Sequence, residues 1–157
     1  MKKYIAYVAF ISIMSCNPIG EDLAETPLMP NEITSIKGLE LKKGEEVVFW
    51  VKNNVSTEGL IDYNLKYSVA LNNKIVSYDS TSVQYGDHTI NSKITESDGI
   101  ISQFFSDENN SAIEFERENK SFKVPEDGKY DFDFKLYNPE DDSFFGKSFS
   151  VILRGKK

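Results

Sequence analysis

Few residues in this chain have side chains suited to catalysis. The sequence holds a single cysteine, Cys16, and a single histidine, His88, which limits the kinds of catalytic site that it can form. A catalytic triad needs an imidazole that an acid orients and that touches a nucleophile. Asp87 is the adjacent acid, but neighbours along a strand point to opposite faces, so we predict that His88 is a surface or strand-edge residue. Zinc sites take several Cys or His ligands, which the sequence does not supply, so we expect no metal site of that kind.

Paired carboxylates are the remaining candidates for acid–base chemistry. Glu114 and Glu116 stand two residues apart in a strand-like segment, and so do Asp131 and Asp133. Such neighbours share one face at roughly 6–7 Å, a spacing compatible with the acid pairs of glycosidases. A catalytic acid also needs a pocket that shifts its pKa, and no sequence feature indicates one. We therefore predict that these side chains form solvated strand faces and that the protein is not an enzyme.

Two acidic turns gather oxygen ligands of the type that calcium prefers, Ser106–Asn110 and Asn138–Ser143. Neither has the spacing of an EF-hand loop. Calcium in these acidic loops is kept as an alternative, and the main expectation is that the protein has no cofactor.

Four aromatic residues are candidates for contact with a partner or ligand. Tyr78 and Tyr137 fall opposite the apolar faces of their strand-like segments, and Tyr85 falls in a loop-like stretch. Phe144 follows an acidic loop, where an apolar side chain can form an exposed patch. We predict that these four side chains contribute to a contact surface.

Cys16 ends a short apolar segment at the start of the chain. Two lysines precede Tyr4–Met14, eleven residues without a formal charge. This run is shorter than the roughly 20 residues of a membrane-spanning helix and has the flanks of a signal peptide. The residues Ile13-Met14-Ser15-Cys16 resemble a bacterial lipobox. The resemblance implies a signal peptide at 1–15, cleavage before Cys16 and acyl chains on its sulfur, two or more of which anchor a protein stably.

Residues 16–31 are predicted to be the lipidated cysteine and a flexible tether, because they hold three of the five prolines and several acids. Cleavage leaves 157 − 15 = 142 residues and removes two lysines, so the formal charge changes from −7 to −9. An acidic surface disfavours nucleic acid as a partner, and it also disfavours anionic headgroups, so the lipid is expected to provide the anchoring. Glu21-Asp22 resembles the acidic export signal of surface lipoproteins in the Bacteroidota.

From residue 32 to residue 157, alternation with period two predicts one all-β domain, an antiparallel β-sandwich of about eight strands, immunoglobulin-like or jelly-roll-like. The clearest alternations lie at 63–71 and 129–137, and Asn72-Asn73 after the first predicts a tight hairpin turn. Segment 45–53 is apolar on both sides, which places Trp50 in the core. Further strands are expected at 74–80, 88–94, 99–105, 111–117, 121–124 and 145–154, with a turn at 118–120.

The two ends of this domain carry a second resemblance. Residues 121–154 combine an F-x-V run, a turn with Gly128 before an aromatic, an alternating strand, a polar loop and a closing apolar strand. Residues 38–51 place a Leu–x–x–Gly turn before the first core strand. Both stretches resemble GOLD-type domains, and this resemblance implies a β-sandwich that binds or positions partners without catalysis.

These features predict a noncatalytic, lipid-anchored protein of the cell envelope that binds a protein partner or assists an assembly. The expected location is the outer membrane of a Gram-negative bacterium, facing the periplasm or the cell surface. Three alternatives stay open: a surface carbohydrate-binding module, with exposed aromatics on one sheet face, a small hydrolase that uses one of the two carboxylate pairs, and a periplasmic inhibitor or immunity protein. Asp79-Ser80-Thr81 resembles the acceptor of O-glycosylation in the Bacteroidota.

Overall fold

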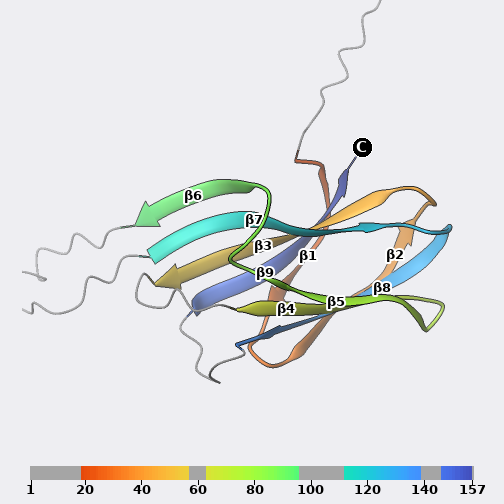
Figure 1. Cartoon of the computed structure of the whole chain (residues 1–157), viewed down its shortest axis with the longest axis horizontal. Coiled ribbons are helices and arrows are strands. Elements are labelled where there is room, and N and C mark those ends of the chain that lie inside the picture. Colours follow the sequence, from red (N-terminus) through yellow and green to blue (C-terminus); the bar gives the residue numbers. More distant parts are fainter. Residues whose placement is uncertain (1–18, 57–62, 96–111, 139–145, 157) are drawn as a thin grey trace, which may run out of the picture.

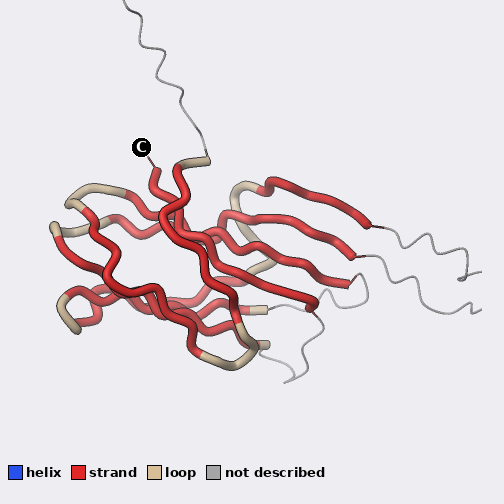
Figure 2. Tube along the Cα trace, turned by 180° about the vertical axis from the view of Figure 1, so that it is seen from behind, coloured by secondary structure: helices blue, strands red, loops and turns tan. Residues whose placement is uncertain are grey.

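The computed structural model describes residues 19–56, 63–95, 112–138 and 146–156, which form a two-layer β-sandwich (Figure 1). These ranges hold nine antiparallel strands: β1 (Glu21–Leu28), β2 (Ile33–Leu41), β3 (Glu46–Ser56), β4 (Asn64–Leu71), β5 (Lys74–Ser82), β6 (Thr89–Thr95), β7 (Ala112–Lys123), β8 (Gly128–Tyr137) and β9 (Gly146–Lys156). Seen from behind, the described chain is almost entirely strand joined by short turns (Figure 2). The expected antiparallel β-sandwich is confirmed. The expected strand at 99–105 lies outside the described residues.

The strand order is that of an immunoglobulin domain with its terminal strands exchanged. The five-stranded sheet runs β1-β9-β3-β7-β6, and the four-stranded sheet runs β2-β8-β4-β5. The neighbours β9-β3-β7-β6 and β4-β8-β2 correspond to A-B-E-D and C-F-G of an immunoglobulin domain, with β5 beside β4 as C′. The central strands also follow that chain order. The exchange puts β9 in the place of strand A and β2 in the place of strand G, and β1 is then added outside β9.

The core lies between the two sheets, and the two clearest alternations supply much of it. The inward side chains that the sequence predicts on β4 and β8 are all buried: Leu65, Tyr67, Val69, Leu71, Tyr130, Phe132, Phe134 and Leu136. The hairpin after β4 is the tight turn that the two asparagines predict, since Asn72 and Asn73 have φ values of 51° and 64°.

Strand β3 is central and buried on both sides, as its sequence predicts. Phe49 points into the main core, where its ring meets Tyr67, Phe132 and Phe134 edge to face, with centroids 4.9, 5.9 and 5.6 Å away. Trp50 points the other way and is also buried, so the expectation that it belongs to a core is confirmed. It lies, however, in a separate small cluster on the outer face of the five-stranded sheet.

The prediction of a flexible tether at residues 16–31 is wrong for half of that range, because Glu21–Leu28 is strand β1 and pairs with β9. The prolines predict extended backbone correctly, but extended backbone also suits a strand. Pro27 lacks an N–H and is tolerated because β1 is an edge strand. Leu28 enters the core, and Pro30 bridges to Leu136. The folded domain therefore begins well before residue 32.

The turn predicted at 118–120 is also wrong, because β7 is continuous from Ala112 to Lys123. Its polar residues form a β-bulge: Phe49 pairs with Lys120 and Trp50 with Glu118, which leaves Asn119 as the extra residue. The side-chain amide nitrogen (Nδ2) of Asn119 donates to the backbone carbonyls of Ser82 and Tyr85, at 2.9 and 3.1 Å. The bulge thus ties β7 to the end of β5.

A tyrosine corner closes the connection from β7 to β8. Tyr130 stands near the start of β8, and its hydroxyl donates to the carbonyl of Glu126, four residues upstream, at 2.7 Å. Immunoglobulin-like sandwiches use this arrangement at the corner before strand F. The ring itself is fully buried and meets Phe122 edge to face, so the bond fixes the turn to the core.

We expect Tyr130→Phe to lower the free energy of unfolding by about 1 kcal/mol, because it removes one hydrogen bond and keeps the ring. Urea unfolding followed by fluorescence measures the change. Tyr78→Phe is the matched control and should leave the midpoint unchanged, since that ring is exposed. Equal midpoints for the two variants would show that the corner bond does not stabilise the fold.

Candidate functional site

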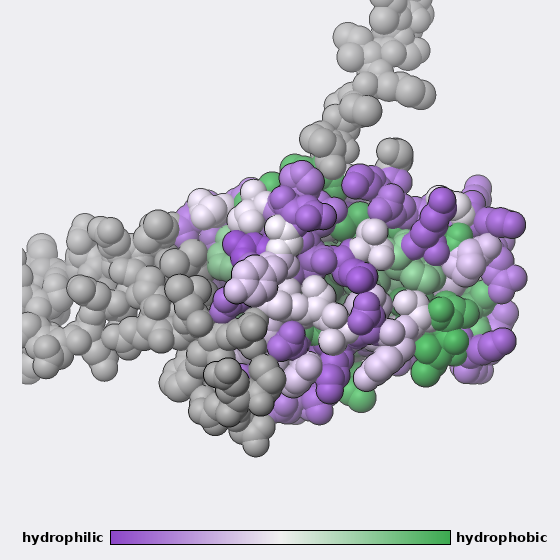
Figure 3. All heavy atoms as spheres, in the orientation of Figure 1, coloured by the Kyte–Doolittle hydropathy of each residue, from purple (hydrophilic) through white to green (hydrophobic). Residues whose placement is uncertain are grey.

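The candidate contact surface is the free edge of β5 and the adjoining outer face of the four-stranded sheet. Strand β5 pairs with β4 on one side only. Ile75 is 62% exposed, Val76 38% and Tyr78 68%. In the space-filling view, an apolar patch lies at the end of the sandwich where the hairpin joins β4 to β5 (Figure 3). Apolar side chains of this size on an edge strand favour contact with another chain.

The register shows which backbone groups of β5 face away from β4. The Val83 amide donates to the Tyr63 carbonyl at 2.8 Å, which marks these residues as a hydrogen-bonded pair. Such pairs recur every second residue of an antiparallel ladder, so Ser77, Asp79 and Thr81 direct their backbone groups to β4. Tyr78 therefore directs its N–H and C=O outward, next to the bulge that the register places at Val76.

One end of this edge is closed. The Asp79 carboxylate accepts from the Ser80 amide at 2.8 Å, and the Ser82 carbonyl accepts from Asn119 of β7. Lys120 adds an ion pair with Asp79 at 3.2 Å. The hydrogen bond from the Ser80 backbone has the largest effect and lowers the pKa of Asp79. The hydrogen bond and the charge of Lys120 lower this pKa further. The open part of the edge is thus confined to Tyr78 and the apolar residues before it.

The four predicted contact residues do not lie together on one surface. Tyr78 is exposed on β5, and Tyr85 is 72% exposed in the connection between β5 and β6. Tyr137 is half-buried on the outer face of the four-stranded sheet, where the ammonium of Lys66 lies 4.2 Å from its ring centroid. Phe144 lies outside the described residues. Tyr78 and Tyr137 therefore share one sheet face, whereas Tyr85 stands beyond the end of β5.

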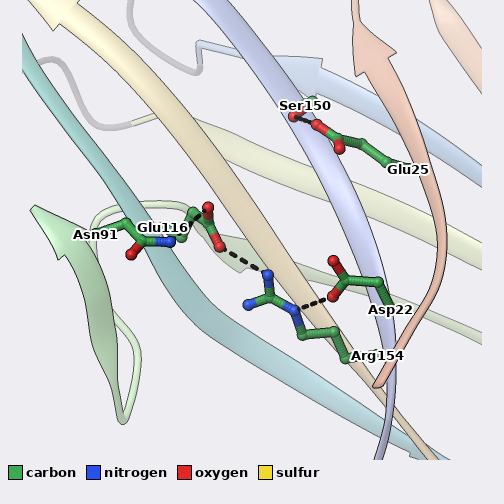
Figure 4. Close-up of polar contacts among 6 residues, drawn as sticks. All are labelled: Asp22, Glu25, Asn91, Glu116, Ser150 and Arg154. Atoms are coloured by element: carbon green, nitrogen blue, oxygen red, sulfur yellow. Dashed lines mark hydrogen bonds and ion pairs between the residues drawn. The ribbon is translucent and has the colours of Figure 1, made fainter. Parts of the chain in front are cut away.

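A polar cluster around the buried side chains of Arg154 and Glu116, which the sequence does not predict, lies on the outer face of the five-stranded sheet (Figure 4). Arg154 of β9 donates from Nε to Asp22 of β1 at 2.5 Å and from Nη2 to Glu116 of β7 at 2.8 Å. Asn91 of β6 donates to the other oxygen of Glu116 at 3.0 Å. Burial works against the charge of Arg154, but its two carboxylate partners outweigh this and raise its pKa. The cluster links four strands of the sheet.

Apolar side chains surround this cluster. The Arg154 guanidinium lies 4.8 Å from the ring centroid of Trp50. Val48 and Ile152 complete the small buried cluster, against which Ile19 and Ile90 pack. Within the described ranges, Trp50 Nε1 and Arg154 Nη1 have no hydrogen-bond partner. The outer face of this sheet is thus partly desolvated.

The paired carboxylates are structural in the described chain. Asp131 accepts from the Gly38 amide at 2.8 Å, and Asp133 accepts from Ser35 and Lys37 at 2.5 and 2.7 Å. Burial alone would raise the pKa of Asp133, but the hydrogen bonds from Lys37 and Ser35 outweigh it and lower that pKa. These contacts fasten β2 to β8.

The prediction of a solvated face is wrong for Glu116, which is buried against Arg154. Glu114, half-buried, lines with it a hollow of about 310 Å³ together with Lys52, Asn91, Lys93 and Phe115. Both oxygens of the Glu116 carboxylate are thus already engaged, one by Arg154 and the other by Asn91.

His88 lies at the surface before β6, as the sequence predicts, and its Nδ1 is 2.7 Å from Glu118. In the part of the chain that the structure describes, no group of three His, Cys, Asp or Glu residues could hold a metal ion. Both acidic turns considered for calcium lie outside the described residues except for Asn138. No helix of the described ranges is long and apolar enough to cross a membrane.

Comparison of the chain with protein-family models, with curated proteins and with solved structures gave no match. The resemblances to a lipobox and to GOLD-type domains therefore stay predictions from the sequence.

We expect Arg154→Met to destabilise the fold by about 3–5 kcal/mol, because it leaves the buried Glu116 carboxylate without its cation. Adding Glu116→Gln to the same chain should restore much of this loss, since the unpaired charge is gone. Asp22→Asn is the matched control: the Asp22 side chain is 66% exposed, so its loss should cost less than about 1 kcal/mol. Urea unfolding of the four proteins measures the set. Equal losses for Arg154→Met and Asp22→Asn would contradict this account.

Proposed function

We propose that this protein is a noncatalytic, lipid-anchored module of the bacterial cell envelope that binds an extended segment of a protein partner along the edge of β5. The observation that carries the proposal is the outward backbone of Tyr78 next to the exposed apolar side chains of Ile75 and Val76, which precede it. An extended peptide can add to such an edge as a further strand, with main-chain hydrogen bonds giving affinity and side chains giving specificity.

Two features of the edge support a short, defined binding site. The contacts of Asp79, Asn119 and Lys120 close the strand beyond Tyr78. The exposed Ile75 and Tyr78 both lie on the outer face, opposite Ala70 and Ser68 of β4. An added strand would pair on the side of β5 away from β4, so its outward side chains could pack beside the exposed Ile75 and Tyr78.

A carbohydrate-binding module is the second candidate, and one observation favours it. Tyr78 and Tyr137 lie on the same outer face, where exposed rings can stack on sugars. Lys66 already covers one face of the Tyr137 ring, which leaves Tyr78 as the more available platform. Binding to a polysaccharide that Tyr78→Ala abolishes would favour this candidate over the protein-binding one.

The membrane anchor is tested by Cys16→Ser. The native protein should incorporate radiolabelled fatty acid and fractionate with membranes, because two or more acyl chains hold a protein stably. The variant should incorporate none and should be released into the soluble fraction. A native protein that is unlabelled and soluble would exclude the anchor.

The edge is tested with a photo-crosslinking amino acid placed at Ile75 in living cells. We expect a discrete adduct there and none at Ile33, a matched position on the edge strand β2 that is 70% exposed. Tyr78→Pro should abolish the adduct, because it removes an outward N–H that the pairing with β4 does not use. Tyr78→Ala removes the ring but keeps the N–H and should retain an adduct.

The pattern across these variants decides between outcomes. Loss of the adduct in Tyr78→Pro alone supports strand addition. Equal loss in Tyr78→Pro and Tyr78→Ala would mean that the ring, and not the backbone edge, is recognised. Equal adducts at Ile75 and Ile33, or none at Ile75, would contradict a partner site on β5.

A further inference from the structure

We propose that the outer face of the five-stranded sheet is the side of the anchored protein that lies toward the lipid bilayer. The outer face of the four-stranded sheet, with the β5 edge, then points to the aqueous phase. This inference rests on the proposed lipidation of Cys16, and it adds an orientation that the anchor alone does not give.

The first step is where the described chain begins. Ile19 packs against the Val48, Trp50 and Ile152 cluster on the outer face of the five-stranded sheet. Gly20 has φ +88°, and a Cβ there would lie 2.5 Å from the Gly155 carbonyl oxygen, so the backbone runs in direct contact with β9. From its first described residue, the chain is therefore held on this sheet.

Further contacts hold the following residues in place. Asp22 pairs with the buried Arg154, and Glu25 accepts from Ser150 of β9 at 2.7 Å (Figure 4). Residues from Glu21 to Leu28 pair with β9. The N-terminal segment that the sequence predicts to be a tether is thus part of the sheet, and it is not available as a spacer.

The second step is length. Two residues, Asn17 and Pro18, separate Cys16 from Ile19, and the three Cα–Cα steps between them span at most about 11 Å when fully extended. The two sheets of a sandwich alone lie about 10 Å apart, and each outer face adds a layer of side chains. A lipid on Cys16 therefore cannot reach around the domain to bring the four-stranded sheet against the bilayer.

The arrangement in space agrees with this limit. Strand β1 begins at the top of Figure 1 beside the C-terminus, whereas β4 and β5 run along the lower part of the same view. The register puts the start of β1 at the same end of the sandwich as the β4–β5 hairpin, but β1 and β5 are edge strands of different sheets and lie on opposite sides of the sandwich. A partner can then reach β5 from the aqueous phase without displacing lipid.

Fluorescence quenching in vesicles tests the orientation of the full lipidated protein. An introduced cysteine is the only free thiol, because the Cys16 sulfur carries the lipid. Lys52→Cys and Lys66→Cys are matched positions: both are half-buried lysines on inner strands, β3 and β4, facing outward from opposite sheets. Each is labelled with a fluorophore, and the vesicles contain phosphatidylcholine with a nitroxide on the headgroup.

We expect quenching several-fold stronger at position 52 than at position 66. Equal quenching, or stronger quenching at position 66, would overturn the orientation. Insertion of a ten-residue Gly/Ser segment between Pro18 and Ile19 should remove the difference, because the limit is the length of the connection. An undiminished difference in the insertion variant would overturn the argument from length.

Flotation of the labelled protein with the vesicles separates the two proposals. A protein that floats but shows no bias in quenching keeps its anchor and loses the proposed orientation. A protein that does not float overturns the lipid anchor and the orientation together.

Discussion

The structure depends on the burial of both faces of one strand, β3. With a single cysteine in the sequence, no disulfide within the chain can hold the two sheets together. Phe49 instead carries the contact between sheets through edge-to-face packing with three rings of the four-stranded sheet. Burial of one such side chain contributes about 1.5–3 kcal/mol, and each ring pair about 0.5–1.5 kcal/mol more. On its other face, Trp50 supports the cluster around Arg154, so one strand serves both sides of the sheet.

The sequence predicts the strands that have one apolar face and misjudges those fixed by partners distant in the chain. Strands β4 and β8 alternate cleanly, because each has a core side and a solvent side. Strand β1 reads as a tether because most of its side chains are exposed, and only the position of β9 makes it a strand. The polar run in β7 reads as a turn, because nothing local shows that Asn119 has acceptors on the β5 side.

The candidate site likewise has one feature that the sequence predicts and others that it does not. Exposure of Tyr78 follows from its place in an alternating segment, and the sequence predicts it. The outward direction of its backbone does not follow, because that direction depends on the register between β4 and β5. The cluster of Arg154, Glu116 and Asp22 joins residues up to 132 positions apart, and each of them reads locally as an ordinary solvated charge. The burial of Arg154 and Glu116 could be found only from the folded arrangement.

The four sheet edges differ in how well they are protected, and this difference supports a specific role for β5. Edge strands need features that prevent unwanted pairing. Strand β1 carries Pro27 and several acids, β2 has a bulge between Ile36 and Leu39, and β6 has one between Ile90 and Lys93.

Strand β5 also has a bulge, but it lies beside exposed apolar residues, and the closing contacts stop short of Tyr78. The acidic charge of the chain limits self-association through such an edge, because two copies repel each other. One end of the β5 edge is closed by side-chain contacts, and the other end exposes apolar side chains. Such an edge is better suited to a specific partner than to non-specific strand pairing. In the proposed orientation, the short connection between Cys16 and Ile19 would add to this selectivity, because it leaves the β5 edge open to a partner from the aqueous phase.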